Sequence, residues 1–557
     1  MRVHALSFLF IGWVTVPAFG QWVGQQAAQI VPSSNPLAQG SEFGGHCALD
    51  ATTLAVGAEW FDPFVGSANH GGVWVFERQG ATWIETAALS SSSYDPDDHF
   101  GSALALEGDR LVVGAVHDDN PNAIASGAAY VFERVAGTWS ESARLVASDA
   151  ANSESFGSSL ALDGDTLVVG AEYESGSGAT FRGAAYVFVW TGVAWTEQAK
   201  LVLPGFAANE FAGCAVALDG DRIVIGARSR DHGGIVNSGA AFVYERVGSV
   251  WTQVAVLAAP DGAANDAFGS AVALDGDTVL VGAPKKIASG TKTGAAYVFR
   301  GAGSTWTLES KLGDLGAAYA DQFGTSIDLE GDRAVIGLPW SGAAGVATGG
   351  VQFFERVGTT WTGHVELVGS ACEGGDYLGT SVALSGDLVA AGAPWGETAP
   401  TGLSTGEAYV FQLVPPPLVR AYCTAKPNSQ GCAPTMAWTG FPSASNPNPF
   451  ELTCSQTLNY KWGLLFYGTA EAAIPFQGGT LCVAPPIERT DVQHSGGSST
   501  GSDCTGAFSY DMNARIQSGV DPTLVAGAAG FAQYWSRDPA DPFTTSLSNA
   551  VEFHIEP

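Results

Sequence analysis

The chain has 557 residues, of which 46% are apolar, 14% are charged and 72 are glycine. This composition excludes a disordered chain, and so much glycine without a collagen period is typical of short strands joined by tight turns. The 24 Lys and Arg against 55 Asp and Glu give a net charge of −31, which disfavours nucleic acid and anionic membranes as partners. We therefore expect an acidic, monomeric, all-β protein.

The first twenty residues have the features of a secretory signal peptide. Arg2 is followed by the apolar stretch 5–16, and Ala18-Phe19-Gly20 provides a small-residue cleavage site. No later segment approaches the roughly 18 uninterrupted apolar residues that a membrane-spanning helix requires. We expect a secreted or cell-surface protein with a signal peptide at 1–20 and no membrane-spanning segment.

The next segment contains a repeat that determines the expected fold. A glycine opens each unit, and successive opening glycines are 55 to 57 residues apart. A fixed period of this length indicates stacked copies of one supersecondary unit. Seven units begin at Gly44, Gly101, Gly157, Gly213, Gly269, Gly324 and Gly379.

Each unit contains four strand-like segments in the same order. In the second unit they are 102–106, 111–115, 128–132 and a segment that begins near Trp139. Small residues in the first segment suit an inner strand close to a central axis, and apolar runs in the second and third suit strands covered on both faces. The pattern predicts a seven-bladed β-propeller over residues 21–414.

Two further repeated features are predicted to be structural. An acidic residue followed by glycine joins the first two strands, which is the composition of a two-residue hairpin turn with positive φ. These pairs are Glu107-Gly108, Asp163-Gly164, Asp219-Gly220, Asp275-Gly276 and Glu330-Gly331. The fourth strands are expected to bury the tryptophans Trp83, Trp139, Trp195, Trp251, Trp306 and Trp361.

The seventh unit contains only three strand-like segments, which end at 408–411. The segment 22–27 begins with Trp22, as the fourth strands of the other units begin with tryptophan. We therefore expect it to complete the seventh sheet, because closure leaves only short, protected strand edges.

Five of the seven opening glycines directly follow a phenylalanine, and we call this place in each unit the Phe position; Ala212 and Leu378 occupy it in the other two units. This Phe-Gly start and a Gly-Ala-Pro-like end of the second strand resemble the FG-GAP repeat family, which includes the integrin α-chain propeller and many bacterial exported proteins. The second-strand ends that carry the likeness are 57–59, 114–116, 282–284, 337–339 and 392–394. The resemblance covers residues 21 to about 414. It implies a seven-bladed propeller used for extracellular recognition and does not name a ligand.

The chain departs from the integrin pattern at the calcium loop. The connection between the first two strands is a short turn, and segments such as 163–165 supply too few oxygens to surround a calcium ion. No cofactor is therefore expected. Acidic residues also recur two positions before the Phe position, and we interpret them as turn formers. The cluster Asp95, Asp97 and Asp98 leaves calcium open as an alternative.

The loops after the second and fourth strands are long and varied, whereas the other connections are short. Function on a rigid scaffold usually lies on such loops. We select as candidate contact residues Trp60, Asp118, Asp119, Arg230, His232, Lys285, Trp340 and Trp395.

Beyond a Pro-rich linker at 415–421, residues 422–557 lose the repeat and gain cysteines, which predicts a separate, small β-sandwich-like domain. It is similar to C-terminal modules of other large exported bacterial proteins. Export permits disulfides, and we favour Cys423–Cys432 and Cys482–Cys504, which leaves Cys454 odd. Spacing cannot fix this connectivity.

No recognised catalytic motif occurs in a supporting context, and the nine histidines occupy unrelated positions in the units. We therefore expect a non-enzymatic binding or adhesion protein that recognises an extracellular protein or glycan through the long loops. The alternative is a propeller-based polysaccharide hydrolase or lyase. A His or carboxylate cluster at the axial mouth would favour that alternative.

Overall fold

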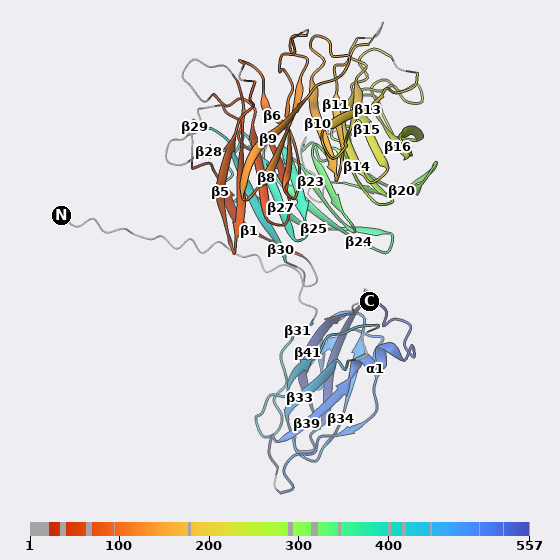
Figure 1. The fold of residues 1–557 in the computed structure, drawn as a ribbon. Coiled ribbons are helices and arrows are strands. Elements are labelled where there is room, and N and C mark those ends of the chain that lie inside the picture. The colour runs from red at the N-terminus through yellow and green to blue at the C-terminus, as the bar shows by residue number, and fades with distance from the viewer. Residues whose placement is uncertain are drawn as a thin grey trace, which may run out of the picture. The chain divides into compact units, whose positions relative to one another are not determined.

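The computed structural model describes residues 22–33, 40–62, 69–93, 95–121, 123–176, 180–205, 207–287, 293–313, 321–342, 347–398, 403–414, 419–445, 448–500, 502–526 and 528–555. The predicted signal peptide at 1–20 and most of the predicted linker lie outside these ranges. The chain divides into two compact units, Met1–Pro415 and Pro416–Pro557 (Figure 1). Within the described ranges, no helix is long and apolar enough to cross a membrane.

The first unit is built from four-stranded antiparallel sheets, and seven of them lie within the described residues. The first three sheets contain β2 (His46–Leu49), β3 (Thr53–Ala58), β4 (Gly72–Gln79) and β5 (Thr82–Leu89); β6 (Phe100–Glu107), β7 (Arg110–Ala115), β8 (Ala128–Val135) and β9 (Thr138–Leu145); and β10 (Phe156–Asp163), β11 (Thr166–Ala171), β12 (Ala184–Trp190) and β13 (Trp195–Leu201).

The next three sheets repeat this order. They contain β14 (Ala212–Asp219), β15 (Arg222–Ala227), β16 (Ala240–Val247) and β17 (Val250–Leu257); β18 (Ala271–Asp275), β19 (Thr278–Ala283), β20 (Ala295–Ala302) and β21 (Thr305–Leu312); and β22 (Ile327–Glu330), β23 (Arg333–Gly337), β24 (Val351–Val357) and β25 (Thr360–Leu367). The seventh contains β26 (Ser381–Ser385), β27 (Leu388–Ala393), β30 (Glu407–Val414) and β1 (Val23–Ile30), with the small hairpin β28 (Glu397–Thr398) and β29 (Leu403–Ser404) beside it.

The pairing of β1 confirms the predicted origin of the missing strand. β1 lies antiparallel to β30, with Val23 opposite Val414 and Ile30 opposite Ala408. Trp22, which precedes β1, is 5% exposed and packs edge-on against Phe353 of the sixth sheet. The seventh sheet therefore combines the two ends of the first unit.

Neighbouring sheets are joined by one recurring parallel bridge. A glycine before the third strand of one sheet pairs with the residue that directly precedes the opening glycine of the next unit. The pairs are Gly71 with Phe100, Gly127 with Phe156, Gly183 with Ala212, Gly239 with Phe268, Gly294 with Phe323, Gly349 with Leu378 and Gly406 with Phe43. The last pair joins the seventh sheet to the first. At Gly127 φ is +85°, and an added Cβ would lie 2.0 Å from the carbonyl oxygen of Phe156. A side chain there would break the junction.

The short connections lie between the first and second strands and between the third and fourth strands. We call this side the short-turn face. The predicted acidic-Gly turns have glycines with φ between 52° and 59°, as a two-residue hairpin requires. Their acidic side chains have a role that the sequence did not indicate. In five turns the carboxylate accepts the glycine N–H of the next sheet's turn, at 2.5 to 2.7 Å, so the turns are linked from sheet to sheet.

The tryptophans of the fourth strands are structural, as predicted. Four of the six are less than 10% exposed: Trp139, Trp195, Trp251 and Trp361. Arginine guanidinium groups cover them from the same sheet or from the preceding one. Examples are Arg134 over Trp139 at 5.1 Å and Arg110 over Trp195 at 5.1 Å. Each contact adds a cation–π interaction to the burial of the ring.

The second unit is a β structure with one short helix among its described residues. A six-stranded sheet contains β31 (Val419–Tyr422), β41 (Thr545–His554), β40 (Ala529–Arg537), β34 (Trp462–Gly468), β37 (Glu488–Arg489) and β38 (Gln493–His494). A three-stranded sheet contains β32 (Thr435–Thr439), β33 (Glu451–Thr457) and β39 (Gly506–Asp511), and β35 (Glu471–Phe476) pairs with β36 (Gly479–Val483). Helix α1 (Met512–Gln517) and both larger sheets contribute to one apolar core. β31 begins within the segment predicted to be linker, because 419–422 pairs with β41.

The predicted disulfide connectivity is wrong, although the four cysteines are the predicted ones. Cys423 bonds to Cys482, and Cys432 bonds to Cys504. Cys423 directly follows β31, and the neighbouring Tyr422 hydroxyl donates a hydrogen bond to the carbonyl of Cys482 at 2.5 Å. Strand packing, and not closeness in sequence, therefore selects the partner. Cys454 is free and buried in the core.

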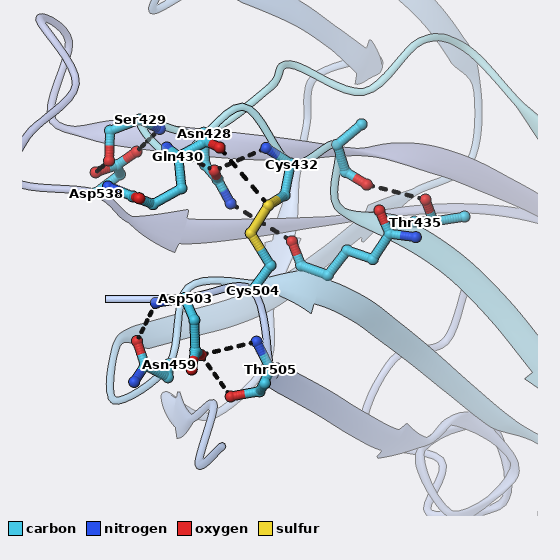
Figure 2. The surroundings of a disulfide bond; sticks show 12 residues. Asn428, Ser429, Gln430, Cys432, Thr435, Asn459, Asp503, Cys504, Thr505 and Asp538 are labelled. Atoms are coloured by element: carbon cyan, nitrogen blue, oxygen red, sulfur yellow. Dashed lines mark hydrogen bonds between the residues drawn. A yellow bond between two sulfur atoms is a disulfide. The ribbon is translucent and has the colours of Figure 1, made fainter. Parts of the chain in front are cut away.

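Side-chain hydrogen bonds hold both loops of the Cys432–Cys504 bridge in place (Figure 2). On one side, Asn428 Oδ1 accepts the backbone N–H groups of Gln430 and Cys432 at 3.0 and 3.1 Å. On the other side, the Asp503 carboxylate accepts the backbone N–H of Thr505 at 3.1 Å and its hydroxyl at 2.6 Å. These contacts order the two chain segments that the disulfide joins.

Candidate functional site

The longer connections of the first unit follow the second and fourth strands, on what we call the long-loop face. Seven residues there occupy one equivalent position, three residues after the glycine that ends the second strand. They form what we call the loop ring: Trp60, His117, Tyr173, Ser229, Lys285, Trp340 and Trp395. Six of them, from His117 onwards, donate the same backbone hydrogen bond, at 3.2 to 3.4 Å, to the carbonyl of the acidic residue three positions before the glycine that opens the unit. The scaffold therefore fixes this position while the side chain varies.

A second set of equivalent residues lies two positions before the glycines that open the units. We call it the entry ring: Glu42, His99, Ser155, Phe211, Ala267, Gln322 and Tyr377. All seven are non-glycine residues with φ between 53° and 58°. Because Ala267 and Gln322 share this left-handed conformation with the aromatic members, the backbone strain belongs to the repeat and does not mark one functional residue.

The two rings meet between neighbouring sheets. The ring centroids of Trp60 and His99 are 4.4 Å apart, those of Tyr173 and Phe211 are 5.7 Å apart, and those of Trp340 and Tyr377 are 4.8 Å apart. In each pair the loop-ring residue comes from one sheet and the entry-ring residue from the next. His117 adds a further contact, 4.7 Å from His99.

Aromatic and imidazole side chains thus occupy consecutive sheets, from the sixth through the seventh and first to the fourth. We call these residues the aromatic band: Trp340, Tyr377, Trp395, Trp60, His99, His117, Tyr173 and Phe211. Its three tryptophans are 46%, 44% and 40% exposed, in this order. Ser229 and Lys285, of the fourth and fifth sheets, interrupt the aromatic members of the loop ring. The band is the largest set of equivalently placed aromatic residues that we find on the long-loop face of the described chain.

The eight candidate contact residues chosen from the sequence divide into three groups. Trp60, Lys285, Trp340 and Trp395 belong to the loop ring and are exposed. Asp118 and Arg230 lie one position further along their loops and turn back into the sheets. Asp118 is fully buried, accepts a hydrogen bond from Tyr130 and pairs with Arg144. Arg230 pairs with Glu210, whose side chain is 5% exposed.

Two other candidates are exposed loop residues outside both rings. The Asp119 carboxylate accepts the backbone N–H of Ala125 at 2.7 Å and thereby closes its own loop. His232 lies in a turn where its backbone pairs with that of Ile235. We withdraw Asp118 as a contact residue, because a fully buried and paired carboxylate cannot meet a ligand at the surface.

Replacing Asp118 with alanine is expected to destabilise the first unit by about 3–5 kcal/mol, because it leaves Arg144 without its carboxylate in a largely buried pair. Chemical denaturation followed by circular dichroism measures this change. Asp119→Ala, at the exposed neighbouring position, is the control and should cost less than about 1 kcal/mol. Equal effects of the two substitutions would contradict the assigned role of Asp118.

The acidic residues that recur before the first strands are turn formers, as interpreted from the sequence. In four of them the carboxylate accepts the backbone N–H of the residue three positions earlier, at 2.6 to 3.1 Å: Asp98, Glu154, Asp266 and Asp376. Within the described ranges, no group of three or more His, Cys, Asp or Glu side chains could hold a metal ion. The carboxylate of Asp97 accepts a hydrogen bond from the Asn69 amide at 2.8 Å.

A titratable cluster lies beside Trp60, between the first and second sheets. His99 Nδ1 is 4.0 Å from Glu59 Oε2, and the pKa values of Glu42 and His46 both respond to the charge of Glu59. Burial, with a smaller contribution from Glu59, raises the pKa of Glu42 to about 7. Burial also lowers the pKa of His46 and His99, against the opposing effect of Glu59. The sequence did not indicate this convergence, because its members come from different units.

The Glu42→Gln variant is expected to gain stability relative to the native chain as pH rises. The folded-state pKa of Glu42 is about 7, above its ordinary 4.5, so the folded chain retains a proton that the unfolded chain loses between these values. Stability therefore falls as pH rises from about 4.5 to 7 in the native chain, and the variant lacks this loss. Melting temperatures of both proteins at pH 5 and pH 8 measure the difference. A difference that does not change with pH would contradict the assignment.

The comparison with known families gives one finding for this chain. Six segments match the model of the FG-GAP repeat, at residues 83–132, 139–188, 195–244, 251–299, 306–354 and 361–411. Each segment begins at the tryptophan of a fourth strand and ends in the third strand of the next sheet, and together they cover more than half of the chain. No curated protein matches the sequence.

Proposed function

Because the chain belongs to the FG-GAP repeat family, we propose that its first unit is a closed seven-bladed β-propeller that binds an extracellular protein or glycan through the long-loop face. The parallel bridge between Gly406 and Phe43, which repeats the other six bridges, supports the closure. The protein acts as a secreted or cell-surface binding or adhesion protein and not as an enzyme. The two disulfides support an extracellular location, since such bonds persist in oxidising compartments.

The observation that carries this proposal is the loop ring with its exposed aromatic residues. A repeated backbone hydrogen bond holds six of the seven loop-ring positions, from His117 to Trp395, while their side chains differ from sheet to sheet. Large exposed aromatic side chains are enriched where proteins bind their ligands. On the short-turn face, by contrast, the acidic and arginine side chains named above are engaged with one another, with backbone groups or with tryptophan rings.

The second unit, Pro416–Pro557, serves in this proposal as a separate β-sandwich-like domain that follows the propeller in the chain. Its own apolar core and its two disulfides support an independent structure. We assign it no activity.

The cluster of Glu42, Glu59 and His99 supports the alternative function, a polysaccharide hydrolase or lyase. A carboxyl group with a raised pKa beside a second carboxylate is an arrangement found in acid–base catalysis. The alternative requires that the chain shortens a polysaccharide and that Glu42→Gln abolishes the cleavage.

One experiment tests the proposed function. The full chain without its signal peptide is applied to an array of extracellular proteins and glycans, and the reaction mixtures are examined for cleaved products. The proposal expects capture of at least one ligand without cleavage. Absence of any capture would overturn it, and cleavage would favour the alternative.

A further inference from the structure

The three exposed tryptophans of the aromatic band lie at the same position of three consecutive sheets. Trp340 belongs to the sixth sheet, Trp395 to the seventh and Trp60 to the first, which the bridge from Gly406 to Phe43 joins to the seventh. The repeat therefore presents similar flat apolar surfaces in regular succession. A ligand with regularly repeated flat apolar faces matches such a row better than an irregular surface does.

The polar groups beside the row suit hydroxyl groups. Glu42 and Glu59 are half-buried, and among the described residues neither side chain accepts a protein hydrogen bond; the nearest recorded partner of Glu59 is His99, at 4.0 Å. The ring of His99 is nearly buried between Trp60, His117 and Glu59. Half-buried carboxylates next to an aromatic surface can accept hydrogen bonds from a ligand that carries many hydroxyl donors.

Charge narrows the class of ligand. The chain has a net charge of −31, and Glu59 adjoins Trp60 in the chain, with Glu42 close enough for the charge of Glu59 to raise its pKa. A polymer of uronic acids or sulfated sugars would be repelled by the chain as a whole and by this part of the site. A neutral sugar chain avoids that repulsion.

We propose that the aromatic band binds a neutral polysaccharide, with successive sugar rings stacked on Trp340, Trp395 and Trp60 and with sugar hydroxyls donating hydrogen bonds to Glu42 and Glu59. This inference rests on the proposed function and makes it more specific. It places the ligand on the part of the aromatic band that runs from the sixth sheet to the second, and not on the remaining members Tyr173 and Phe211 or on the positions of Ser229 and Lys285.

Calorimetric titration of the full chain with defined sugar polymers tests the inference. The probes are cellohexaose, mannohexaose, xylohexaose and soluble mixed-linkage glucan as neutral chains, and hexagalacturonate as the anionic one. The variants are Trp60→Ala, Trp340→Ala and Trp395→Ala. The control is Trp462→Ala, which removes a tryptophan that is 54% exposed in the second unit. Unchanged melting curves ensure that each variant is folded.

We expect binding of at least one neutral probe and none of hexagalacturonate. Each of the three band substitutions should weaken that binding at least tenfold, and Trp462→Ala should leave it unchanged. Glu59→Gln should weaken it less than the tryptophan substitutions do, because an amide oxygen still accepts a hydrogen bond.

Three results would overturn the inference: no neutral probe binds, only the anionic probe binds, or neutral binding persists in all three tryptophan variants. The array separates this failure from that of the proposed function. One outcome is capture of an extracellular protein that depends on the long loops, without binding of any neutral sugar. It would refute polysaccharide binding by the aromatic band and would leave the proposed binding function of the long-loop face standing. No capture of either kind would refute both.

Discussion

Deleting residues 21–31 is expected to lower the melting temperature of the first unit by roughly 10 °C or more. The deletion removes β1 and Trp22, so β30 loses one of its two neighbours in the seventh sheet and becomes an edge strand. Burial of one tryptophan is worth about 4–6 kcal/mol as an upper bound, and each kcal/mol shifts the melting temperature of a large domain by about 2–4 °C. Differential scanning calorimetry measures the change.

Two single substitutions separate the effect of the side chain from that of the strand. Trp22→Ala should reproduce a large part of the loss, because Trp22 is 5% exposed and its indole N–H donates to Glu355 at 2.8 Å. Gln25→Ala, at an exposed position of the same strand, should have little effect. A melting curve that the deletion leaves unchanged would rule out the role of β1.

Loss of either disulfide is expected to destabilise the second unit by about 4 kcal/mol. The bonds Cys423–Cys482 and Cys432–Cys504 close loops of 59 and 72 residues, and cross-links of this span strongly restrict the unfolded chain. One double variant replaces Cys423 and Cys482 with alanine, and the other replaces Cys432 and Cys504. Chemical denaturation of the two variants measures the loss of stability for each disulfide separately. Cys454→Ala is a control for the removal of a thiol without a disulfide, although its buried position makes a small loss of packing expected.

Peptide mapping of the unreduced protein tests the pairing itself. The expected products link Cys423 to Cys482 and Cys432 to Cys504. Recovery of a peptide that links Cys423 to Cys432 would contradict the connectivity described above, and so would a stability that does not depend on reducing agent.

The repeat made much of the first unit predictable. The spacing of its glycines, the acidic-Gly turns and the tryptophans of the fourth strands are local signals, because each lies within one unit and recurs in register. The fourth strand of the seventh sheet was also found, since Trp22 matches a position that the last unit lacks. The predicted segment at 102–106 and the observed β6 differ only in length, as is usual for strand ends.

The site was only partly predictable. Trp60 and Asp118 were both selected because they lie in long loops. Trp60 occupies the loop-ring position, whose side chain is exposed. Asp118 occupies the next position along its loop, where the side chain turns toward Arg144. That partner lies 26 residues away, and no property of the loop alone reveals it. The entry ring was not predicted as a set, although the sequence carries a signal for it: the residue before the Phe position is aromatic or imidazole at His99, Phe211 and Tyr377.

The disulfides and the titratable cluster depend on contacts between distant segments. Cys423 lies closer in sequence to Cys432, but the packing of β31 and β36 brings it to Cys482. In the same way, Glu59 begins the loop that follows β3, and His99 precedes the first strand of the next sheet, so their convergence exists only after the sheets have packed side by side.

A hydrogen-exchange footprint of the bound ligand tests the central claim most directly, since it locates the binding surface on the intact chain. The account predicts slower exchange upon binding in the loops that contain Trp340, Trp395 and Trp60, with no change in the turns of the short-turn face, such as 107–110 and 219–222. Protection confined to the short turns or to residues 422–557 would contradict it.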